Sequence, residues 1–394
     1  MQDVMILSAK RTPIGSFLGS LSAVSAANLG AASIKAAVDS AGIKPEDVEH
    51  VIMGNVLQAG QGQAPARQAA IYAGLPKSTG AVTLHKVCGS GMRTVMDAAN
   101  AIRAGEWEVM VAGGMESMSN APHLLEGSRS GYRMGEVKVS DSMVKDGLWD
   151  PYGDKHMGSC AELCADKYQF TREAQDAFTL ESYTRAQKAV ESGQFADELV
   201  NVDVPQRKGD PLRVDKDEEP FKAPLDKMAK LKPAFDREGT VTAANASKIN
   251  DGAAALVLAS AERAKALGAK PLARIISYGS FAQEPEWFTT SPVGAAKSAL
   301  ERAGLTAGDI DLWEVNEAFA LVAMAFIHDM EIDAAKVNTR GGAVALGHPI
   351  GCSGARIITT LLHAMLQEKK RYGCAAICIG GGEGTAVVIE NMTL

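Results

Sequence analysis

Two segments of the sequence carry residues that together could perform nucleophilic catalysis. Cys88 stands where an apolar run gives way to Gly89-Ser90-Gly91 and a helical pattern. His348 lies in a second glycine-containing segment, residues 347–354. A cysteine sulfur attacks as its thiolate, and a histidine can take the proton. Because Cys88 precedes a helix start, we expect the partial positive charge of the unpaired N–H groups there to lower its pKa.

Two further segments place polar or reactive groups where apolar stretches end. Asn316 follows one such stretch, and Cys378 precedes three glycines at 380–382. A second cysteine beside exposed backbone N–H groups is typical of an acid–base group next to a site that stabilises an oxyanion. Each residue also has an ordinary structural interpretation, because Cys378 could pack inside a strand and His348 could occupy a turn before Pro349.

The surroundings of Cys88 recur downstream at a nearly constant spacing. Ser90 corresponds to Ser353 at an offset of 263 residues (353 − 90), and Gly42 corresponds to Gly304 at an offset of 262 (304 − 42). Such regularity over about 60 residues indicates an internal duplication, rather than chance similarity between helices rich in Ala and Gly. The chain therefore has two related halves.

Short apolar runs alternate with helical patterns in the first half. The predicted elements, in order, are a strand at 4–8, a helix at 28–41 ended by Gly42, a strand at 48–54, a helix at 66–73, a helix with apolar positions from 92 to 102 ended by Gly105, and a strand at 109–112. Short joints between such elements predict parallel neighbouring strands and right-handed crossovers.

The middle of the chain differs in composition from both halves. Residues 120–250 hold few strand signals and a charged tract at 207–232, which predicts a loop-rich insertion with a helix at 172–192. We expect an α/β protein in three parts: 1–119 as the first part of the N-terminal half, 120–250 as a loop domain and the return to that half, and 251–394 as the C-terminal half.

Composition excludes several classes of protein. The 394 residues are 46% hydrophobic and 22% charged with a net charge of −7, which argues against general binding to nucleic acid or anionic membranes. No apolar run is long enough to span a bilayer, and the N-terminus carries no basic leader, so we expect a cytoplasmic protein. No Gly-x-Gly-x-x-Gly follows the first strand, which argues against a nucleotide-dependent redox enzyme.

Six cysteines are too few and too scattered for a disulfide framework, and this also favours a reducing compartment. His156, Cys160 and Cys164 are spaced at i, i+4 and i+8, as ligands of a metal ion could be. Three ligands on one helix seldom converge on one ion, so we expect buried, packed cysteines here and no metal site. Cys352 and Cys374 are also expected to be structural.

Taken together, these segments resemble the thiolase family over the whole chain. The stretches that carry the resemblance are Val87-Cys88-Gly89-Ser90-Gly91-Met92, residues 113–119, Asn316-Glu317-Ala318-Phe319, residues 341–354 and residues 378–382. His156-Met157-Gly158 and residues 240–247 resemble the acetyl-CoA acetyltransferase branch. The resemblance implies the five-layered αβαβα thiolase fold, with two duplicated α/β halves, a loop domain over the active site, and assembly as a homotetramer (a dimer of dimers).

The resemblance also implies the reaction. Cys88 would attack acetyl-CoA with His348 as its base, and Cys378 would deprotonate a second acetyl-CoA. The resulting carbanion would attack the acetyl-cysteine, giving acetoacetyl-CoA and CoA in a reversible Claisen condensation. Asn316 would hold a water at the enolate oxygen, and the N–H groups of Cys88 and Gly380 would face the tetrahedral oxyanion. No cofactor is implied, because CoA is substrate and product.

Ten side chains are placed against CoA by the same resemblance: Leu148, His156, Met157, Lys222, Lys227, Phe235, Ala243, Ser247, Phe288 and Phe319. Lys222 and Lys227 would contact the CoA phosphates, because the Tyr-x-Arg of bacterial relatives is absent. Met157 and Phe288 would border the acyl group, and their bulk favours short acyl chains, although one methylene changes binding by only about 1–3 kcal/mol.

The chain departs from the family pattern at two positions near the catalytic segments. His85 and Arg340 stand where asparagines are common, and they could tune the pKa of Cys88 or His348. Two other interpretations of the whole chain stay open at this point. One is a degradative 3-ketoacyl-CoA thiolase that accepts longer chains, and the other is a catalytically silent relative that binds acyl-CoA.

Overall fold

One mixed sheet of ten strands runs through both halves of the chain in the computed structural model, which describes residues 2–394. Its first-half strands are β1 (Val4–Arg11), β3 (His50–Gly54), β4 (Gly80–Leu84), β5 (Val109–Ser117) and β12 (Asn250–Ser260), with the short β2 (Gly15–Ser16) paired to β12. Its second-half strands are β13 (Ala273–Ala282), β14 (Leu312–Val315), β15 (Tyr372–Ile379) and β16 (Glu383–Asn391). The two halves join where β1 pairs with β13 over three residues.

The strand order confirms the predicted duplication. The first half contains the order β3-β5-β12-β1, and the second half repeats it as β14-β15-β16-β13. Both repeats open with a parallel pair and continue with antiparallel pairs. The starts of β3 and β14 differ by 262 residues (312 − 50), and those of β5 and β15 by 263 (372 − 109).

The predicted parallel pairing is right for β3 and β5 but wrong for β1. The chain returns from the insertion as β12, which pairs antiparallel with both β1 and β5 and separates them. The predicted boundary between residues 250 and 251 falls after the first residue of β12. Residues 251–260, which were predicted to belong to the C-terminal half, therefore lie in the sheet of the first half. The other domain limits stay a prediction.

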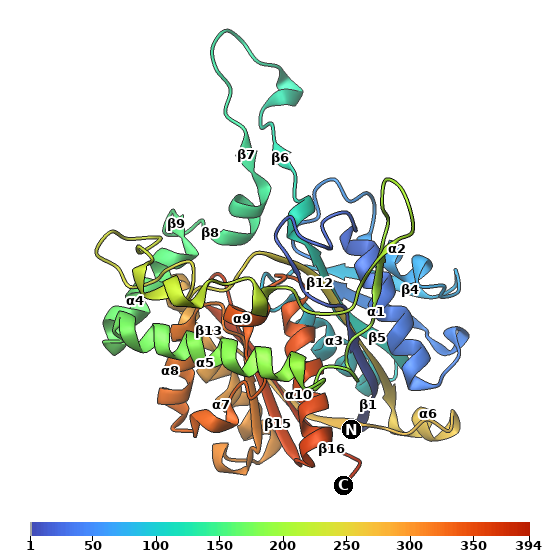
Figure 1. Ribbon diagram of the computed structural model, residues 1–394. Coiled ribbons are helices and arrows are strands. Elements are labelled where there is room, and N and C mark those ends of the chain that lie inside the picture. Colours follow the sequence, from blue (N-terminus) through green and yellow to red (C-terminus); the bar gives the residue numbers. More distant parts are fainter. Residues whose placement is uncertain (1) are drawn as a thin grey trace.

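The two halves of the sheet form two layers, and helices lie between them and on both outer faces, which gives five layers in all (Figure 1). The helices that pack on the sheet are α1 (Ala26–Ala41), α2 (Pro65–Tyr72), α3 (Ser90–Ala104), α7 (Ser291–Ala303), α8 (Ala320–Met330) and α10 (Ser353–Glu368). One core lies under α1 and α2, a central core holds α3 and α10 between the two halves, and a third lies under α7 and α8.

Alternation along β1 shows why the strands serve two cores at once. Val4 and Ile6 belong to the central core, whereas Met5 and Leu7 belong to the core under α1, as the two-residue period of a strand requires. The sequence reads as a continuous apolar run because both faces of this strand are covered.

The two predicted helix ends are also confirmed, since Gly42 and Gly105 close α1 and α3 with φ angles of 67° and 76°. Gly304, the counterpart of Gly42 in the second half, closes α7 with a φ of 67°. These angles lie in the left-handed region that glycine adopts without a steric cost, so each glycine satisfies the last carbonyls of its helix.

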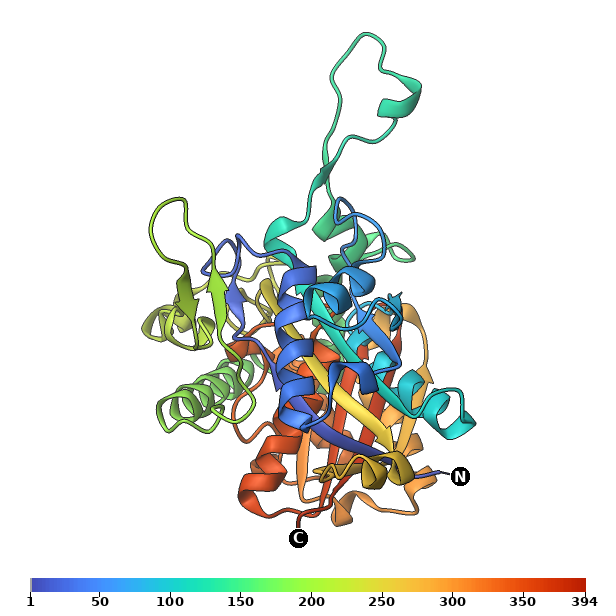
Figure 2. The same cartoon turned by 90° about the vertical axis from the view of Figure 1, so that its right-hand side faces the viewer.

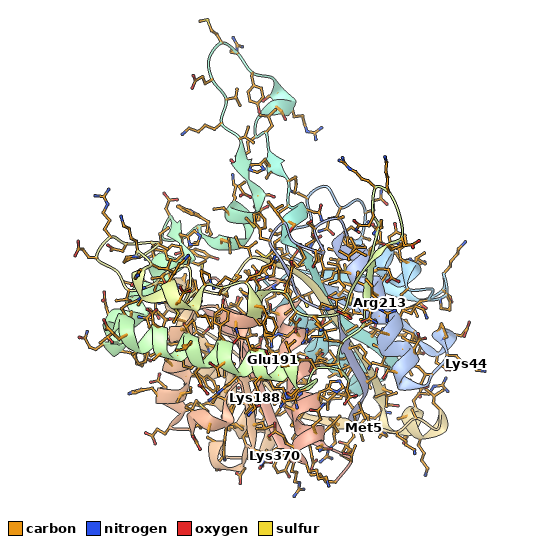
Figure 3. The ribbon with its side chains drawn as sticks, in the orientation of Figure 1. Met5, Lys44, Lys188, Glu191, Arg213 and Lys370 are labelled. Atoms are coloured by element: carbon orange, nitrogen blue, oxygen red, sulfur yellow. The ribbon has the colours of Figure 1, made fainter. Side chains whose placement is uncertain are left out.

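The insertion is loop-rich, as predicted. Its helices are α4 (Met157–Tyr168) and α5 (Arg172–Glu191), and its strands are β6 (His123–Leu124), β7 (Ser140–Asp141), β8 (Trp149–Asp150), β9 (Lys155–His156), β10 (Val202–Val204) and β11 (Leu212–Val214). The β6–β7 hairpin carries an arm that projects far from the body in two perpendicular views (Figures 1 and 2). Helix α5 crosses the second half, with Lys188 and Glu191 near its C-terminal end (Figure 3).

Shorter elements complete the chain. They are α6 (Ala261–Ala266), α9 (Ala343–Leu346), a π turn at Val144–Leu148, and 3-10 turns at Pro45–Asp47, Met118–Asn120, Ser128–Ser130, Glu219–Phe221, Leu225–Lys230, Pro285–Thr290, Ala307–Asp309 and Ala334–Lys336. Over residues 2–394, no helix combines the length and the apolar character needed to cross a membrane.

Candidate active site

Cys88 lies in a tight turn between β4 and α3. The preceding Val87 has a φ of 44°, a left-handed conformation that is unusual for a β-branched residue. The N–H of Gly89 donates to the carbonyl of Lys86 at 3.1 Å and closes the turn. A Cβ at Gly89 would overlap the side chain of Ile379, so the turn can approach β15 only with glycine here. Backbone strain of this kind is common where a side chain must be aimed at a ligand.

The turn opens into a cavity of about 570 Å³ with mainly apolar walls. Three of the predicted catalytic residues line it: Cys88, His348 in the loop before α10, and Gly380 just after β15. Asn316 and Cys378 are fully buried and are not among the lining residues. Cys378 lies on β15, and Asn316 directly follows the neighbouring strand β14, with its N–H donating to a carbonyl of β15 at 3.0 Å.

Nine of the ten side chains predicted to contact CoA line the same cavity. They are Leu148, His156, Met157, Lys222, Phe235, Ala243, Ser247, Phe288 and Phe319. Lys227 is not among the lining residues and lies exposed on the turn at Leu225–Lys230, so its contact with the CoA phosphates stays a prediction. Lys222 lines the cavity with its ammonium 2.6 Å from a carboxylate oxygen of Glu218.

The hydrogen bonds of His348 fix which nitrogen can accept a proton. Its Nδ1 lies 2.5 Å from the Oγ of Ser353, and that hydroxyl donates to the carbonyl of Pro349 at 2.9 Å. A serine hydroxyl has one hydrogen, so Ser353 must accept from Nδ1–H, and Nε2 carries the lone pair. Among the described residues Nε2 has no hydrogen-bond partner, and His348 faces the cavity that holds Cys88.

The surroundings of Cys88 and His348 favour the neutral form of each side chain. Burial raises the pKa of Cys88 to about 11, although the N–H groups of Gly380 and Cys88 act in the opposite direction. Burial and the nearby guanidinium of Arg356 lower the pKa of His348 to about 3. The expected lowering of the Cys88 pKa is therefore wrong for the free site, because loss of water outweighs the N–H groups around the sulfur.

The two unusual side chains near the catalytic segments make other contacts. The Nδ1 of His85 accepts the N–H of Val87 at 3.2 Å, and Arg340 donates to the carbonyl of Gln194 at 2.9 Å. The positive charge that acts on His348 is instead that of Arg356. The proposed tuning by His85 and Arg340 stays a prediction without a supporting contact to either catalytic side chain.

Cys378 differs from Cys88 in being completely enclosed. Burial raises its pKa well above the ordinary value, and the neighbouring sulfur of Cys88 raises it further. Cys160 and Cys164 are buried in the core beside Phe288, as expected of packed cysteines, and Cys352 and Cys374 are buried as well.

The chain is similar to known proteins over nearly its whole length. The family model "Thiolase, N-terminal domain" matches residues 4–262, and "Thiolase, C-terminal domain" matches residues 269–391. The chain belongs to the thiolase family. Acetyl-CoA acetyltransferase of Cupriavidus necator is 55% identical over 99% of this chain and 100% of that protein. The mitochondrial acetyl-CoA acetyltransferase of Homo sapiens is 51% identical over 100% of this chain and 91% of its own length.

A solved thiolase structure has the same fold. The Acat5 thiolase from Ascaris suum in complex with coenzyme A superposes with a TM-score of 0.95 at 44% identity, covering 99% of this chain and 100% of that one. The predicted thiolase fold is therefore confirmed.

Two polar side chains of this thiolase were missed by the sequence analysis. The buried carboxylate of Glu116 accepts the N–H groups of Val56, Leu57 and Gly351 and so ties two loops together. Lys248 lines the cavity itself. Glu116 lies inside a stretch that carried the family resemblance, but neither role has a local sequence signal, since the partners of Glu116 lie up to 235 residues away.

Proposed function

We propose that this thiolase condenses two molecules of acetyl-CoA reversibly to acetoacetyl-CoA and CoA through an acetyl-Cys88 intermediate. The observation that carries the proposal is the convergence of the Cys88 thiol, the His348 Nε2 lone pair and the Gly380 N–H at one cavity of about 570 Å³. The relatives named acetyl-CoA acetyltransferase and the CoA-bound neighbour support it.

In the first half-reaction, the Cys88 sulfur attacks the thioester carbon while His348 takes the thiol proton. A neutral thiol needs such a base, since the thiolate is the reactive form. The C–S bond to CoA then breaks, and the departing CoA sulfur takes a proton from Cys378. The high pKa of Cys378 suits this step, because the group holds a proton at rest. The products are acetyl-Cys88 and free CoA, with His348 protonated and Cys378 ionised.

In the second half-reaction, the Cys378 thiolate removes a proton from the methyl group of another acetyl-CoA. The enolate oxygen forms beside protonated His348 and a water held by Asn316, whose amide has no hydrogen-bond partner within residues 2–394. The carbanion then attacks acetyl-Cys88, and the oxyanion is stabilised by the N–H groups of Cys88 and Gly380. Collapse forms acetoacetyl-CoA and expels the Cys88 sulfur, which recovers its proton from His348.

The acyl end of the cavity favours a short substrate over the broad-range alternative. Met157 and Phe288 both line it, and Phe288 packs edge-on against Phe319 with ring centroids 6.3 Å apart. Because buried aromatic side chains pack closely with their neighbours, Phe288 has little freedom to move aside and make room for a longer acyl group.

Thiolysis of acetoacetyl-CoA by CoA, followed as loss of absorbance, tests the proposal. We expect the wild type to be active and Cys88→Ala to lose at least about 10³-fold in kcat, because the covalent route disappears. Substrates of four to ten carbons should show declining kcat/KM with length. An inactive wild type would favour the silent acyl-CoA-binding alternative, and a flat length profile would favour the degradative one.

We also propose a homotetramer in a reducing, cytoplasmic environment. All six cysteines are free thiols, and Cys88 and Cys378 must remain so for the reaction. The arm between β6 and β7 exposes apolar side chains to solvent, including Leu125, Met134 and Val139. Exposed apolar side chains grouped on a projecting element favour contact with another copy of the chain.

A further inference from the structure

One lysine in the cavity wall has no part in the reaction described above. The ammonium of Lys248 donates to two carbonyls of its own loop, that of Ala244 at 3.0 Å and that of Ala246 at 2.8 Å. The loop, residues 242–248, also carries Ala243 and Ser247 into the cavity. The lysine thus bends back and lies as a cation between carbonyl oxygens of its own loop.

Acidic and aromatic groups from other segments face this ammonium. Burial lowers the pKa of Lys248 to about 8, while Glu219 and Glu317 act in the opposite direction. The ring of Tyr183, on α5, has its centroid 5.9 Å from the lysine nitrogen. The ammonium is therefore enclosed by acceptors and an aromatic face, as a bound cation would be.

The loop is bonded to both catalytic segments. The carbonyl of Lys248 accepts the N–H of His348 at 3.3 Å. The N–H of Ser247 donates to the carbonyl of Ala318, two residues after Asn316, at 3.0 Å. A shift of this loop would therefore move a wall of the cavity and disturb the backbone beside two catalytic side chains.

We propose that Lys248 is a positioning residue whose ammonium serves as a built-in cation for the loop 242–248 and so holds the wall against which CoA binds. Carbonyl oxygens that converge on one point repel each other unless a cation or an N–H donor lies between them. The inference rests on the proposed binding of CoA in this cavity. It assigns to a side chain the task that a small monovalent cation performs when main-chain carbonyls coordinate it.

Substitution of Lys248 by methionine tests this, because methionine has similar length and no charge. We expect the KM for CoA in thiolysis to rise about tenfold and kcat to change by less than about threefold. This is the pattern expected when a lost interaction stabilises bound substrate and transition state equally. Potassium or ammonium chloride at about 0.1 M should restore much of the affinity of the variant, whereas choline chloride, at equal ionic strength, should not. The wild type should respond to none of these salts beyond a common screening effect.

The controls separate this inference from the proposed function and from misfolding. Lys270→Met removes an exposed lysine and should leave the KM unchanged. Thermal melting with and without CoA reports binding without turnover, so it tests Lys248 even if the wild type shows no thiolysis. Lys248→Gln keeps amide donors without the charge, and it carries the same test if the methionine variant does not fold.

Three results for the Lys248 variant would overturn the assignment. The first is an unchanged KM for CoA together with an unchanged shift in melting temperature on adding CoA. The second is a loss of CoA affinity that potassium, ammonium and choline restore equally, and the third is a loss of CoA affinity that no cation restores. The last two would show that Lys248 contributes packing or general charge rather than a bound cation.

Discussion

At the scale of single residues, the proposed nucleophile of this thiolase, Cys88, shares the cavity with His348, and the surroundings of both favour the neutral form. The turn at Cys88 supplies N–H groups that favour a thiolate, but enclosure by the cavity disfavours the charge more strongly. His348 is kept neutral and in the Nδ1–H form by burial, Arg356 and Ser353. The pair is therefore set to transfer a proton only when a substrate arrives.

This pairing predicts a specific pH dependence for alkylation of Cys88 by iodoacetamide in the free enzyme. With a pKa of about 11, the thiolate fraction rises about tenfold per pH unit through the neutral range, so the alkylation rate should climb from pH 7 to pH 9 without a plateau. Mass spectrometry after partial labelling measures the rate at each cysteine, with Cys88→Ala as the control. A rate that levels off below pH 8 would indicate a thiolate–imidazolium pair instead.

Residue types and spacing identified the reactive groups but not those that tune them. Cys88 and His348 stood out because a thiol and an imidazole each lay in a glycine-containing turn. Ser353 and Lys248 gave no such signal, since their effects depend on contacts that only the folded chain creates. The direction of the Cys88 pKa could not be predicted either, because it depends on how much water the cavity excludes.

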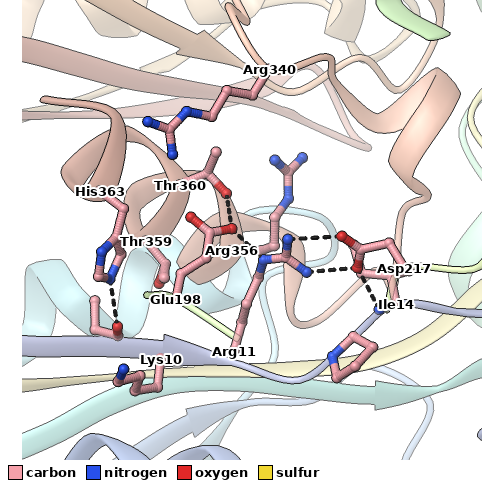
Figure 4. A network of polar contacts seen from close by, with 12 residues as sticks. Lys10, Arg11, Ile14, Glu198, Asp217, Arg340, Arg356, Thr359, Thr360 and His363 are labelled. Atoms are coloured by element: carbon pink, nitrogen blue, oxygen red, sulfur yellow. Dashed lines mark hydrogen bonds and ion pairs between the residues drawn. The ribbon is translucent and has the colours of Figure 1, made fainter. Parts of the chain in front are cut away.

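At the scale of elements, a buried ion network holds the insertion and the two halves together. Arg11 on β1 donates to Glu198 at 2.5 Å and, through two nitrogens, to Asp217 at 2.7 and 2.9 Å. Thr360 on α10 donates to the same Glu198 at 3.1 Å, and Arg356 and Arg340 lie close by (Figure 4). Strand β1 is thereby linked to a helix of the other half through residues of the returning insertion.

Arg11→Met should lower the free energy of unfolding by about 3–5 kcal/mol, because it leaves two buried carboxylates without their cation. Thermal or urea unfolding followed by circular dichroism measures the loss. Lys35→Met is the matched control, since the ion pair of Lys35 with Asp39 is exposed on α1 and should contribute no more than about 0.5 kcal/mol. Equal losses in the two variants would show that the network does not stabilise the fold.

The sequence predicted most elements but not their neighbours. Apolar periodicity and terminal glycines were enough to locate α1, α3 and β3 within a few residues. The insertion of β12 between β1 and β5 was missed, because strand pairing across more than 130 residues leaves no local pattern.

At the scale of the whole molecule, the arm between β6 and β7 projects away from the rest of the chain (Figures 1 and 2). It stands away from the sheet and helices, with Met134 completely exposed at 104% relative accessibility. An element that buries so little within its own chain gains stability only from contact with another molecule.

Leu125→Asp combined with Val139→Asp should therefore weaken assembly, because each places a charge in an apolar contact. We expect light scattering to report dimers in place of tetramers, with thiolysis per chain falling by less than about threefold. Leu212→Asp, at a leucine of similar exposure on β11, should leave the molecular mass unchanged. An unaltered mass in the double variant would remove the arm from the assembly.

By itself the sequence determined the duplicated α/β architecture, the family and the candidate nucleophile, because periodicity, terminal glycines and reactive side chains at turns are local features. The tertiary structure decided which charged groups reach the cavity, placing Lys248 in its wall and Lys227 outside it. It also decided that Cys88 rests as a thiol. Burial and long-range contacts determine both which lysine lines the cavity and whether Cys88 is protonated. Neither burial nor long-range contacts can be predicted from the residues adjacent in the sequence.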